Sequence, residues 1–378
     1  MHWSGETARA ARKRAPPDGR APRGPSPSRW LWRLHRPLSA TIVTLTRESR
    51  ITNHESRITP LLVRGLASEH LVLWLTVAGF VVLLPFTPGL GSRENLGNVL
   101  FTLLPLFVLA TGQTLVLITA GIDLSVCSIM ALASVVGGLA MNGDSGWLAG
   151  SAWAAPTGVL LMLLVGATVG ALNGVAIALL RMPPFIVTLT SMMGVSGLAI
   201  WLTRGQTLYG LPQGFNALGG RLPLVALLTL VAAGVAHLLL RRTLYGRWLF
   251  AIGHNPRMAR VSGVPVAGVT AGTYVASGWL AAVAAILFTG QAETASPQLG
   301  QRLLLDVIAA TVIGGTSLFG GRGAVLWTLA GVLFIKLLDN SLNLLNVSFF
   351  AITMIKGGVV LTAALLDTTR RRLLEAGS

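Results

Sequence analysis

The stretch Thr111–Ser128, TGQTLVLITAGIDLSVCS, constrains the fold of this chain more than any other segment. It is a long apolar run that is interrupted by Gly121 and then by the carboxylate of Asp123. A charge at membrane depth is costly, and lipid cannot satisfy the hydrogen-bonding groups of a broken helix. The segment must therefore be buried in protein or lie on a water-filled path, as in a protein that moves something across a bilayer.

Composition assigns the chain to the integral membrane proteins. Of its 378 residues, 53% are hydrophobic and 11% are charged, and the mean hydropathy is +0.69. Water-soluble domains carry about 25% charged residues. We therefore predict an all-α fold, a polytopic helical bundle, in which the abundant glycines favour close helix packing. The single cysteine, Cys127, excludes a disulfide within the chain.

Apolar runs of about 20 residues, each long enough to cross a bilayer once, follow from Leu71 onward. They predict about ten transmembrane helices, at residues 68–87, 98–120, 122–141, 156–180, 183–203, 222–240, 267–289, 303–320, 323–344 and 347–366. Arginines at the ends of these runs then favour an orientation with both termini cytoplasmic. If Gly121–Ser128 is a break at mid-membrane depth, however, one span is lost and the later loops invert.

The net charge of +16 does not indicate a nucleic-acid-binding protein, because its distribution follows the predicted topology. Twelve of the 29 basic residues lie in residues 1–60, a low-complexity segment rich in Arg, Pro and Ser. We interpret this segment as a disordered extension or as the product of a start site placed too early. Residues 61–367 form the predicted transmembrane domain, with a cytoplasmic loop at 241–266, and residues 368–378 form a basic cytoplasmic tail.

Two interpretations of the interruption in the first stretch are open. Gly121 can end one helix, because glycine adopts left-handed dihedral angles without strain. Asp123 can then cap the next helix, since its carboxylate accepts hydrogen bonds from free amides. Alternatively, Asp123 contacts a solute or a gate.

The loop Arg241–Val266 is the longest connection within the predicted membrane domain. It carries five arginines and an apolar stripe at Leu244, Trp248, Leu249 and Ile252. Gly253 and Gly263 are placed to end short helices, and Pro256 is placed to start one. The loop is therefore either an amphipathic piece on the membrane surface or a docking helix for a cytoplasmic partner.

The stretch Asp306–Gly323 contains two glycine pairs that allow tight crossings and expose polar backbone, so it either packs closely or lines a path. Val312–Leu318 can be aligned with Ile118–Leu124, which indicates duplicated halves or chance similarity. Farther along, the spacing of Lys336 and Asp339 predicts an ion pair on one helix face.

For four other polar residues in or between the last two spans, the sequence does not identify the partner. Lys356 has no obvious partner in the sequence. Asn340, Asn343 and Asn346 are placed to bond sugar hydroxyls or neighbouring helices.

The chain lacks a loop of the form GxxxxGKS or GxxxxGKT, which cradles nucleotide phosphates. If ATP drives transport, another polypeptide must hydrolyse it. We accordingly predict that the chain is not an enzyme and binds no cofactor, with ATP held by a partner subunit.

Four motifs carry a resemblance to a known family. They are Gly112–Thr114 with Gly121–Val126, then Pro184–Leu189, then Gly246–Gly263, and last Ile308–Ala310 with Gly314–Gly321. In this order they resemble the permease subunits of bacterial ABC importers for simple sugars, the ribose-type family within the branched-chain amino acid and ribose permease superfamily. Cys127 stands where that family usually has Gly, and His254 and Pro256 also depart from its pattern.

The resemblance implies two sets of functional residues and no catalytic or metal-binding ones. Coupling to an ATPase would involve residues of the inner loop: Gly246, Arg247, Ala251, Gly253, Asn255, Ala259 and Gly263. The translocation path and its helix breaks would involve Gln113, Gly121, Asp123, Ser125, Phe185, Thr188, Gly314, Gly315 and Thr316.

The resemblance also implies an assembly in the bacterial inner membrane. Its partners would be two ATP-binding-cassette ATPase subunits, a second copy of the permease or a close homologue, and a periplasmic sugar-binding protein. We expect alternating access for a monosaccharide such as ribose. The open alternatives are an importer for a nucleoside or another small polar solute, and a secondary transporter driven by an ion gradient through Asp123, Asp306 or Lys336.

Overall fold

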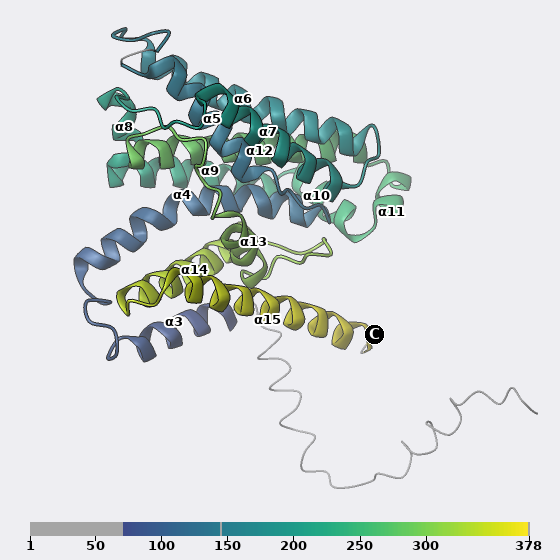
Figure 1. The fold of residues 1–378 in the computed structure, drawn as a ribbon. Helices are drawn as coiled ribbons and strands as arrows, with labels where there is room; N and C mark the ends of the chain where they lie inside the picture. The colour runs from purple at the N-terminus through teal and green to yellow at the C-terminus, as the bar shows by residue number, and fades with distance from the viewer. Residues whose placement is uncertain (1–70, 144–145, 377–378) are drawn as a thin grey trace, which may run out of the picture. The chain divides into compact units, whose positions relative to one another are not determined.

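The computed structural model describes residues 71–143 and 146–376 of the chain, and these residues are helical almost throughout (Figure 1). The expectations for residues 1–60 lie outside the described part. The helices are α3 Leu71–Leu83, α4 Arg93–Ile118, α5 Val126–Met141, α6 Ala154–Ala178, α7 Pro184–Thr203, α8 Gln213–Gly220, α9 Leu222–Arg242, α10 Leu244–His254, α11 Pro256–Val261, α12 Val266–Ala292, α13 Leu304–Ile313, α14 Val325–Leu344 and α15 Phe349–Ala376.

The predicted multi-pass helical bundle is confirmed in its main feature. Within the described residues, six helices are long and apolar enough to span a membrane: α4, α6, α7, α9, α12 and α14. Shorter apolar helices account for the other predicted spans.

The span predicted at 303–320 is wrong in its second half, because α13 ends at Ile313. Its ten residues rise about 15 Å, half of a bilayer core. The chain turns away at Gly314 and Gly315, and Gly315 has the positive φ of 83° that favours glycine. Likewise α5, expected at 122–141, begins only at Val126.

Helices α6 and α12 form the closest helix pair, and small residues make the approach possible. Gly166, Gly170 and Gly174 lie four apart along α6, and a Cβ atom at any of them would meet the backbone of α12. In the same way, a Cβ atom at Gly278 of α12 would collide with the carbonyl oxygen of Gly166. Lipid tails are as apolar as leucine, so close van der Waals contact of this kind, rather than apolar burial, holds helices together in a membrane.

Helix α4 is the central element of the bundle. It contacts α12 and α9 on one side and α13 and α14 on the other, and its second half, from Leu103 to Ile118, is buried (Figure 1). Two hydroxyls join it to α14, because Thr114 Oγ1 and Thr328 Oγ1 share a 2.7 Å hydrogen bond. The end of α4 at Ile118 is therefore fixed inside protein.

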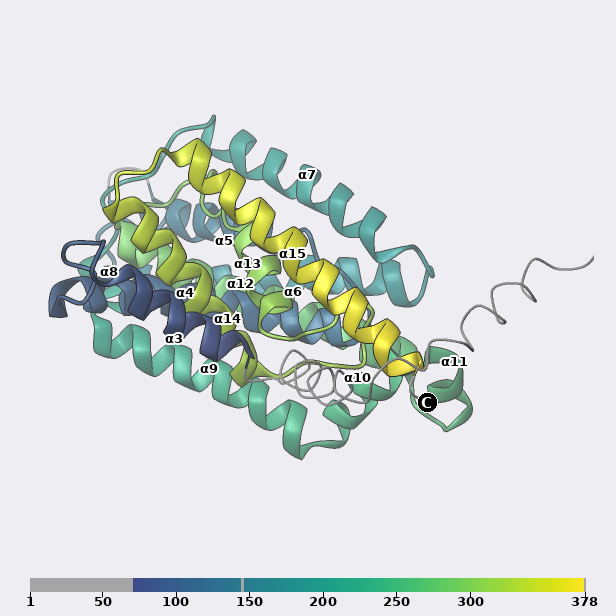
Figure 2. The ribbon, with the colours of Figure 1, turned by 90° about the horizontal axis from the view of Figure 1, so that it is seen from below.

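The inner loop predicted at 241–266 folds into two short helices, α10 and α11, which we call the coupling segment. Figures 1 and 2 show it beyond the end of α9, at the end of the bundle toward which the C-terminal half of α15 runs. Since α10 also contacts α12 and α4, the segment is packed against the bundle.

Candidate functional site

The first break, Thr119–Ser125, separates α4 from α5 and contains one residue in the left-handed region of backbone conformation. The sequence predicted Gly121 as the left-handed residue, and this is wrong: Ala120 adopts the positive φ of 61°. Gly121 is required for space instead, because a Cβ atom there would lie 2.6 Å from the hydroxyl oxygen of Tyr274.

Asp123 is the centre of the first break and is fully buried. Its Oδ1 accepts hydrogen bonds from the amide of Ser125 (2.9 Å) and from the hydroxyl of Ser125 (2.6 Å). Its Oδ2 accepts from the hydroxyl of Ser277 in α12 (3.0 Å). Asn173 of α6 donates to Ser125 Oγ at 2.9 Å. The first break, α12 and, through Ser125, α6 are therefore joined around one carboxylate.

This network bears on the two interpretations of Asp123. The residue at the cap position of α5 is Ser125, whose side chain makes no capping hydrogen bond, and Asp123 stands two residues earlier. The carboxylate nevertheless takes up the Ser125 amide, as the capping interpretation required. Asn173 and Ser277 were missed by sequence reasoning. The signal for Asn173 was an amide within an apolar, glycine-rich run.

The remaining path candidates near the first break separate into buried and exposed residues. Gln113 is fully buried, and neither its amide oxygen nor its amide nitrogen has a hydrogen-bond partner among the described residues. Thr188 is buried too, with its hydroxyl 3.2 Å from the carbonyl oxygen of Ile122. Phe185 differs, because more than half of its surface is exposed. The structure thus brings Thr188 to the break and leaves Phe185 outside it.

The coupling segment is held by caps and by a buried apolar face. The hydroxyl of Thr243 accepts from the amide of Gly246 at 3.3 Å. Asn255 caps α11, because its Oδ1 accepts from the amides of Arg257 (3.0 Å) and Met258 (3.1 Å). Of the apolar stripe, which was expected to face the membrane surface or a partner, Leu249 and Ile252 are instead buried against the bundle, Trp248 is half-buried and Leu244 is exposed.

Some of the other residues predicted for coupling are packed against the bundle, and others are exposed. A Cβ atom at Gly246 would collide with carbonyl oxygens of α9, and Ala259 is buried. Ala251 is half-buried, whereas Arg247 is exposed. Gly263 follows α11 with φ of 83°, which agrees with the predicted helix end.

Tyr245 anchors the coupling segment to α12. Its hydroxyl lies 3.2 Å from the carbonyl oxygen of Val269 and 3.0 Å from Thr273 Oγ1. Burial raises the pKa of the Tyr245 phenol, and the hydrogen bond with Thr273 opposes this increase. The phenol therefore remains a neutral hydrogen-bonding group at neutral pH.

The coupling segment meets both interruptions of the bundle at Gly253. We call Gly314–Ala324, which joins α13 to α14, the second break. A Cβ atom at Gly253 would collide with the carbonyl oxygen of Ile118 and with the amide nitrogen of Gly321. That amide donates to the same Ile118 carbonyl at 2.9 Å. Gly253 was predicted as a helix end, yet α10 runs on to His254, so it is the close approach of three backbones that requires glycine here.

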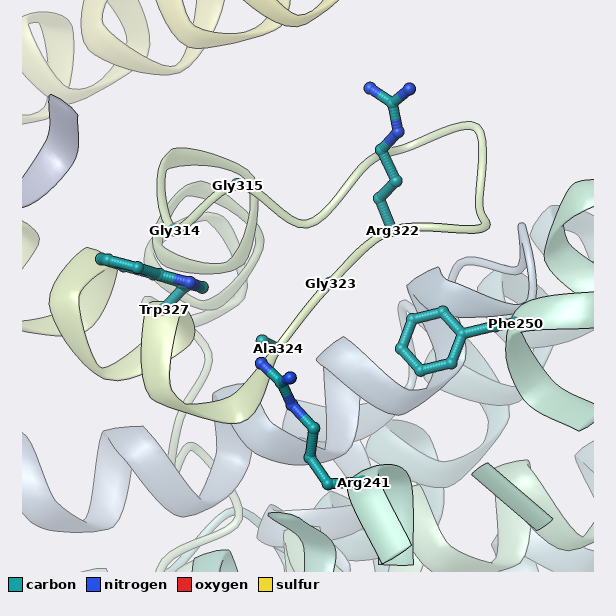
Figure 3. A pocket seen from close by; sticks show the side chains of 8 residues that line it. All are labelled: Arg241, Phe250, Gly314, Gly315, Arg322, Gly323, Ala324 and Trp327. Carbon is teal, nitrogen blue, oxygen red and sulfur yellow. The ribbon is translucent and has the colours of Figure 1, made fainter. Parts of the chain in front are cut away.

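A cavity of about 280 Å³ opens beside this junction (Figure 3). Its lining joins the end of α9, α10, both ends of the second break and the start of α14, through Arg241, Phe250, Gly314, Gly315, Arg322, Gly323, Ala324 and Trp327. In Figure 3 the Arg241 side chain points toward Ala324 at the start of α14. Nearby Thr316 is buried, and its hydroxyl has no partner among the described residues.

A cluster of charges lies on α13, α14 and α15, and it differs from the predicted pairing. Lys356 Nζ lies 3.1 Å from Asp306 Oδ2 and 2.9 Å from Asp339 Oδ1. Lys336, the expected partner of Asp339, makes no ion pair in the described part of the chain. The prediction failed because Lys356, although distant in sequence, reaches both carboxylates from α15.

The asparagines that follow on α14 serve neighbouring groups. Asn340 exchanges two hydrogen bonds of 2.9 Å with Asn95 of α4. Asn343 donates to the backbone carbonyl of Asp339 at 2.7 Å. Asn346 occupies the turn after α14 with φ of 53°. Of the two interpretations, a bond to a neighbouring helix therefore holds for Asn340 in this structure.

Known proteins are similar to this sequence over most of its length. The profile of the family described as "Branched-chain amino acid transport system / permease component" matches residues 95–365. A ribose import permease of Bacillus subtilis (strain 168) is 39% identical over 267 residues, covering 69% of this chain and 80% of that protein. A ribose import permease of Escherichia coli (strain K12) is 34% identical over 298 residues, covering 75% and 89%.

A xylose transport system permease of Escherichia coli (strain K12) is 29% identical over 378 residues. That similarity covers 82% of this chain and 94% of the xylose permease. The comparison with solved structures found no match.

Proposed function

The chain belongs to the family of branched-chain amino acid transport system permease components, and we propose that it carries a monosaccharide of the ribose type across the bacterial inner membrane. The resemblance noted from its four motifs is confirmed, and the chain is a non-catalytic transmembrane subunit. Within the proposal, two ATP-binding-cassette ATPases, a second permease copy and a periplasmic sugar-binding protein complete the importer, ATP is bound by the ATPases, and both termini of this chain are cytoplasmic.

The junction at Gly253 is the observation that carries the mechanism. A force applied to the coupling segment reaches α4 through Ile118 and the second break through Gly321, with backbone in contact on both sides. An ATPase that moves α10 would therefore move the elements that interrupt the bundle. Such a device shifts a population between outward-open and inward-open states and needs no bond-breaking group of its own.

The exposed side of the coupling segment supports docking rather than simple connection. Met258 and Val261 of α11 are 60% and 83% exposed, beside exposed Arg257 and Arg260. The short helix thus combines large apolar side chains with positive charge. A partner with an apolar pocket rimmed by acidic groups fits this surface.

The rival, a secondary transporter driven by an ion gradient, finds less support in the geometry. Asp123, its first candidate coupling group, already accepts three hydrogen bonds from serine groups. Asp306, its second, is paired with Lys356. A coupling ion would have to displace these partners at both carboxylates. Lys336, the third candidate, makes no ion pair among the described residues, so the ion-gradient measurement below decides on it.

Reconstitution tests the proposal. Proteoliposomes containing the permease, the ATPase that co-purifies with it and its soluble sugar-binding protein should accumulate labelled ribose only with ATP inside. Uptake should ignore uncouplers. Competition by xylose and by a nucleoside then ranks the solutes. Full-speed uptake by the permease alone, or uptake abolished by collapsing the ion gradient, would contradict the proposal.

A further inference from the structure

Helix α15 makes few contacts with the bundle, and one of them is a charged side chain that pairs with two other helices. Phe349 at its start lies under the guanidinium of Arg302, 4.7 Å from the ring centroid, and Val360 packs against the core. Among the α15 side chains that the structure describes, Ile352 is the buried one, and Phe350 and Met354 are each 78% exposed. Lys356, one turn after Ile352, bridges Asp306 of α13 and Asp339 of α14. Because apolar burial gives little association energy between helices in lipid, we take the two ion pairs as the contacts that fix α15 against α13 and α14.

Helices α13 and α14, in contrast, form one tightly packed pair. A Cβ atom at Gly331 of α14 would collide with the carbonyl oxygen of Ala310, and one at Gly314 would collide with that of Trp327. The two carboxylates that hold Lys356 therefore belong to a single rigid unit. Lys356 fastens α15 to this unit from one side.

A second lysine lies next to the same carboxylates. Lys336 stands one turn before Asp339 on α14, and it interacts electrostatically with both Asp306 and Asp339. It makes no ion pair in the described part of the chain. Two lysines on different helices thus lie near Asp339, Lys356 through an ion pair and Lys336 one turn away on the same helix, and among the described residues Lys356 is the one that bridges both carboxylates.

This arrangement solves a problem that any movement of α15 would create. If Lys356 left without a replacement, the buried carboxylate of Asp306 and the partly buried one of Asp339 would both lose their ion-pair partner, which is costly. Lys336 can reach Asp339 along its own helix face. With the lysine exchanged, the carboxylates keep a partner in both positions of α15.

We propose that Lys356 is a positioning residue that holds α15 against α13 and α14, and that Lys336 takes its place when α15 moves during transport. Only the timing of the exchange, within the transport cycle, rests on the proposed function. Gly321 of the second break approaches Gly253, so the coupling segment is connected to this rigid unit through the second break. Exchange of one lysine for another is a two-state element of the kind that switching proteins use.

The attachment is tested on the full-length permease alone in nanodiscs. Spin labels replace Leu326 of α14 and Met354 of α15, both exposed, in a Cys127→Ala background, and pulsed electron paramagnetic resonance measures their separation. The parent should give one main distance. Lys356→Met should lower the population of that distance about tenfold, and Lys356→Arg should restore it. An unchanged distance distribution in Lys356→Met would overturn the proposal.

The exchange is tested with Lys336→Met, which a purely structural role of Lys356 would leave silent. We expect the parent distance and an unfolding temperature that is not lower, together with ATP-driven uptake slowed about tenfold. Leu333→Met, one turn earlier on α14, is the matched control and should transport normally. Normal uptake in Lys336→Met would overturn the exchange. Failure of the parent to take up sugar would count against the proposed function instead, while the distance measurements still decide the attachment.

Discussion

The two breaks of the bundle satisfy the hydrogen-bonding groups of an interrupted helix by different means. In the first break, side chains provide the hydrogen bonds: Asp123, Ser125, Asn173 and Ser277 form a closed, buried network. In the second break, backbone groups make most of these bonds, since the amide of Ser317 donates to the carbonyl of Arg322 and the amide of Gly321 donates to that of Ile118. One side chain takes part, because Ser317 Oγ accepts from the amide of Phe319 at 3.2 Å. The second break also exposes Gly315, Phe319 and Arg322.

The difference indicates a division of labour. A break held by two of its own side chains and by one from each of two helices, α6 and α12, has one favourable geometry, because each buried donor needs its acceptor. A glycine-rich break held by backbone bonds can change its dihedral angles at lower cost. We infer that the first break is the fixed reference and that the second is the compliant element.

The largest effect is expected for Asp123→Ala. It removes the acceptor of three buried hydrogen bonds, so the free energy of unfolding should fall by about 4 kcal/mol. The unfolding midpoint of the purified permease in nanodiscs measures the loss. Asp123→Asn keeps one acceptor oxygen, and its unfolding midpoint should lie between those of the wild type and Asp123→Ala. A wild-type midpoint for Asp123→Ala would mean that the first break is as compliant as the second.

Gly253→Val should have the next largest effect, and it acts on the contact between the breaks. The new side chain would collide with backbone on two sides, at a cost of about 3 kcal/mol, and ATP-driven uptake should fall roughly a hundredfold. Co-purification with the ATPase should weaken in parallel. Gly268→Val in α12, where a Cβ atom meets open space, is the control. Normal uptake in Gly253→Val would remove the junction from the mechanism.

Local chemistry made one part of this site predictable from sequence. Local signatures mark three features: the apolar run that ends near Gly121, the carboxylate of Asp123 and the proline that starts α11. The structure places all three near the helix ends expected from the sequence. The partners came from elsewhere in the chain. Ser277 lies 154 residues from Asp123, and no periodicity relates them.

Spatial proximity explains the errors as well. Lys336 and Asp339 satisfy the helical spacing rule, yet Lys356 takes the carboxylate because α15 lies beside α14. Gly121 and Gly253 were both read as helix ends, whereas each is required where another chain segment approaches closely. A sequence shows that glycine is present, but tertiary packing decides whether its dihedral freedom or its small size is used.

Asn173→Ala tests whether the first break is cooperative. It removes one donor to Ser125 Oγ and should cost about 1.5 kcal/mol in unfolding free energy. In a double-mutant cycle with Ser277→Ala, whose hydroxyl bonds the same network through Asp123, the two losses should not add. Thr289→Ala in place of Ser277→Ala, at a separate hydrogen bond with Ser134, is the additive control. Strict additivity for the first pair would show that its side chains act independently.

Gly315→Ala should have the smallest effect and tests the compliant element directly. The residue adopts a φ of 83°, but a Cβ atom there meets nothing within 4 Å, so backbone strain of about 1 kcal/mol is the whole expected cost. Gly314→Ala is the matched contrast, because its Cβ would collide with the carbonyl oxygen of Trp327. Unfolding midpoints should therefore separate two adjacent glycines of one break. If Gly315→Ala proved as damaging as Asp123→Ala, the second break would be as rigid as the first, and the coupling segment would have to act through α4 alone.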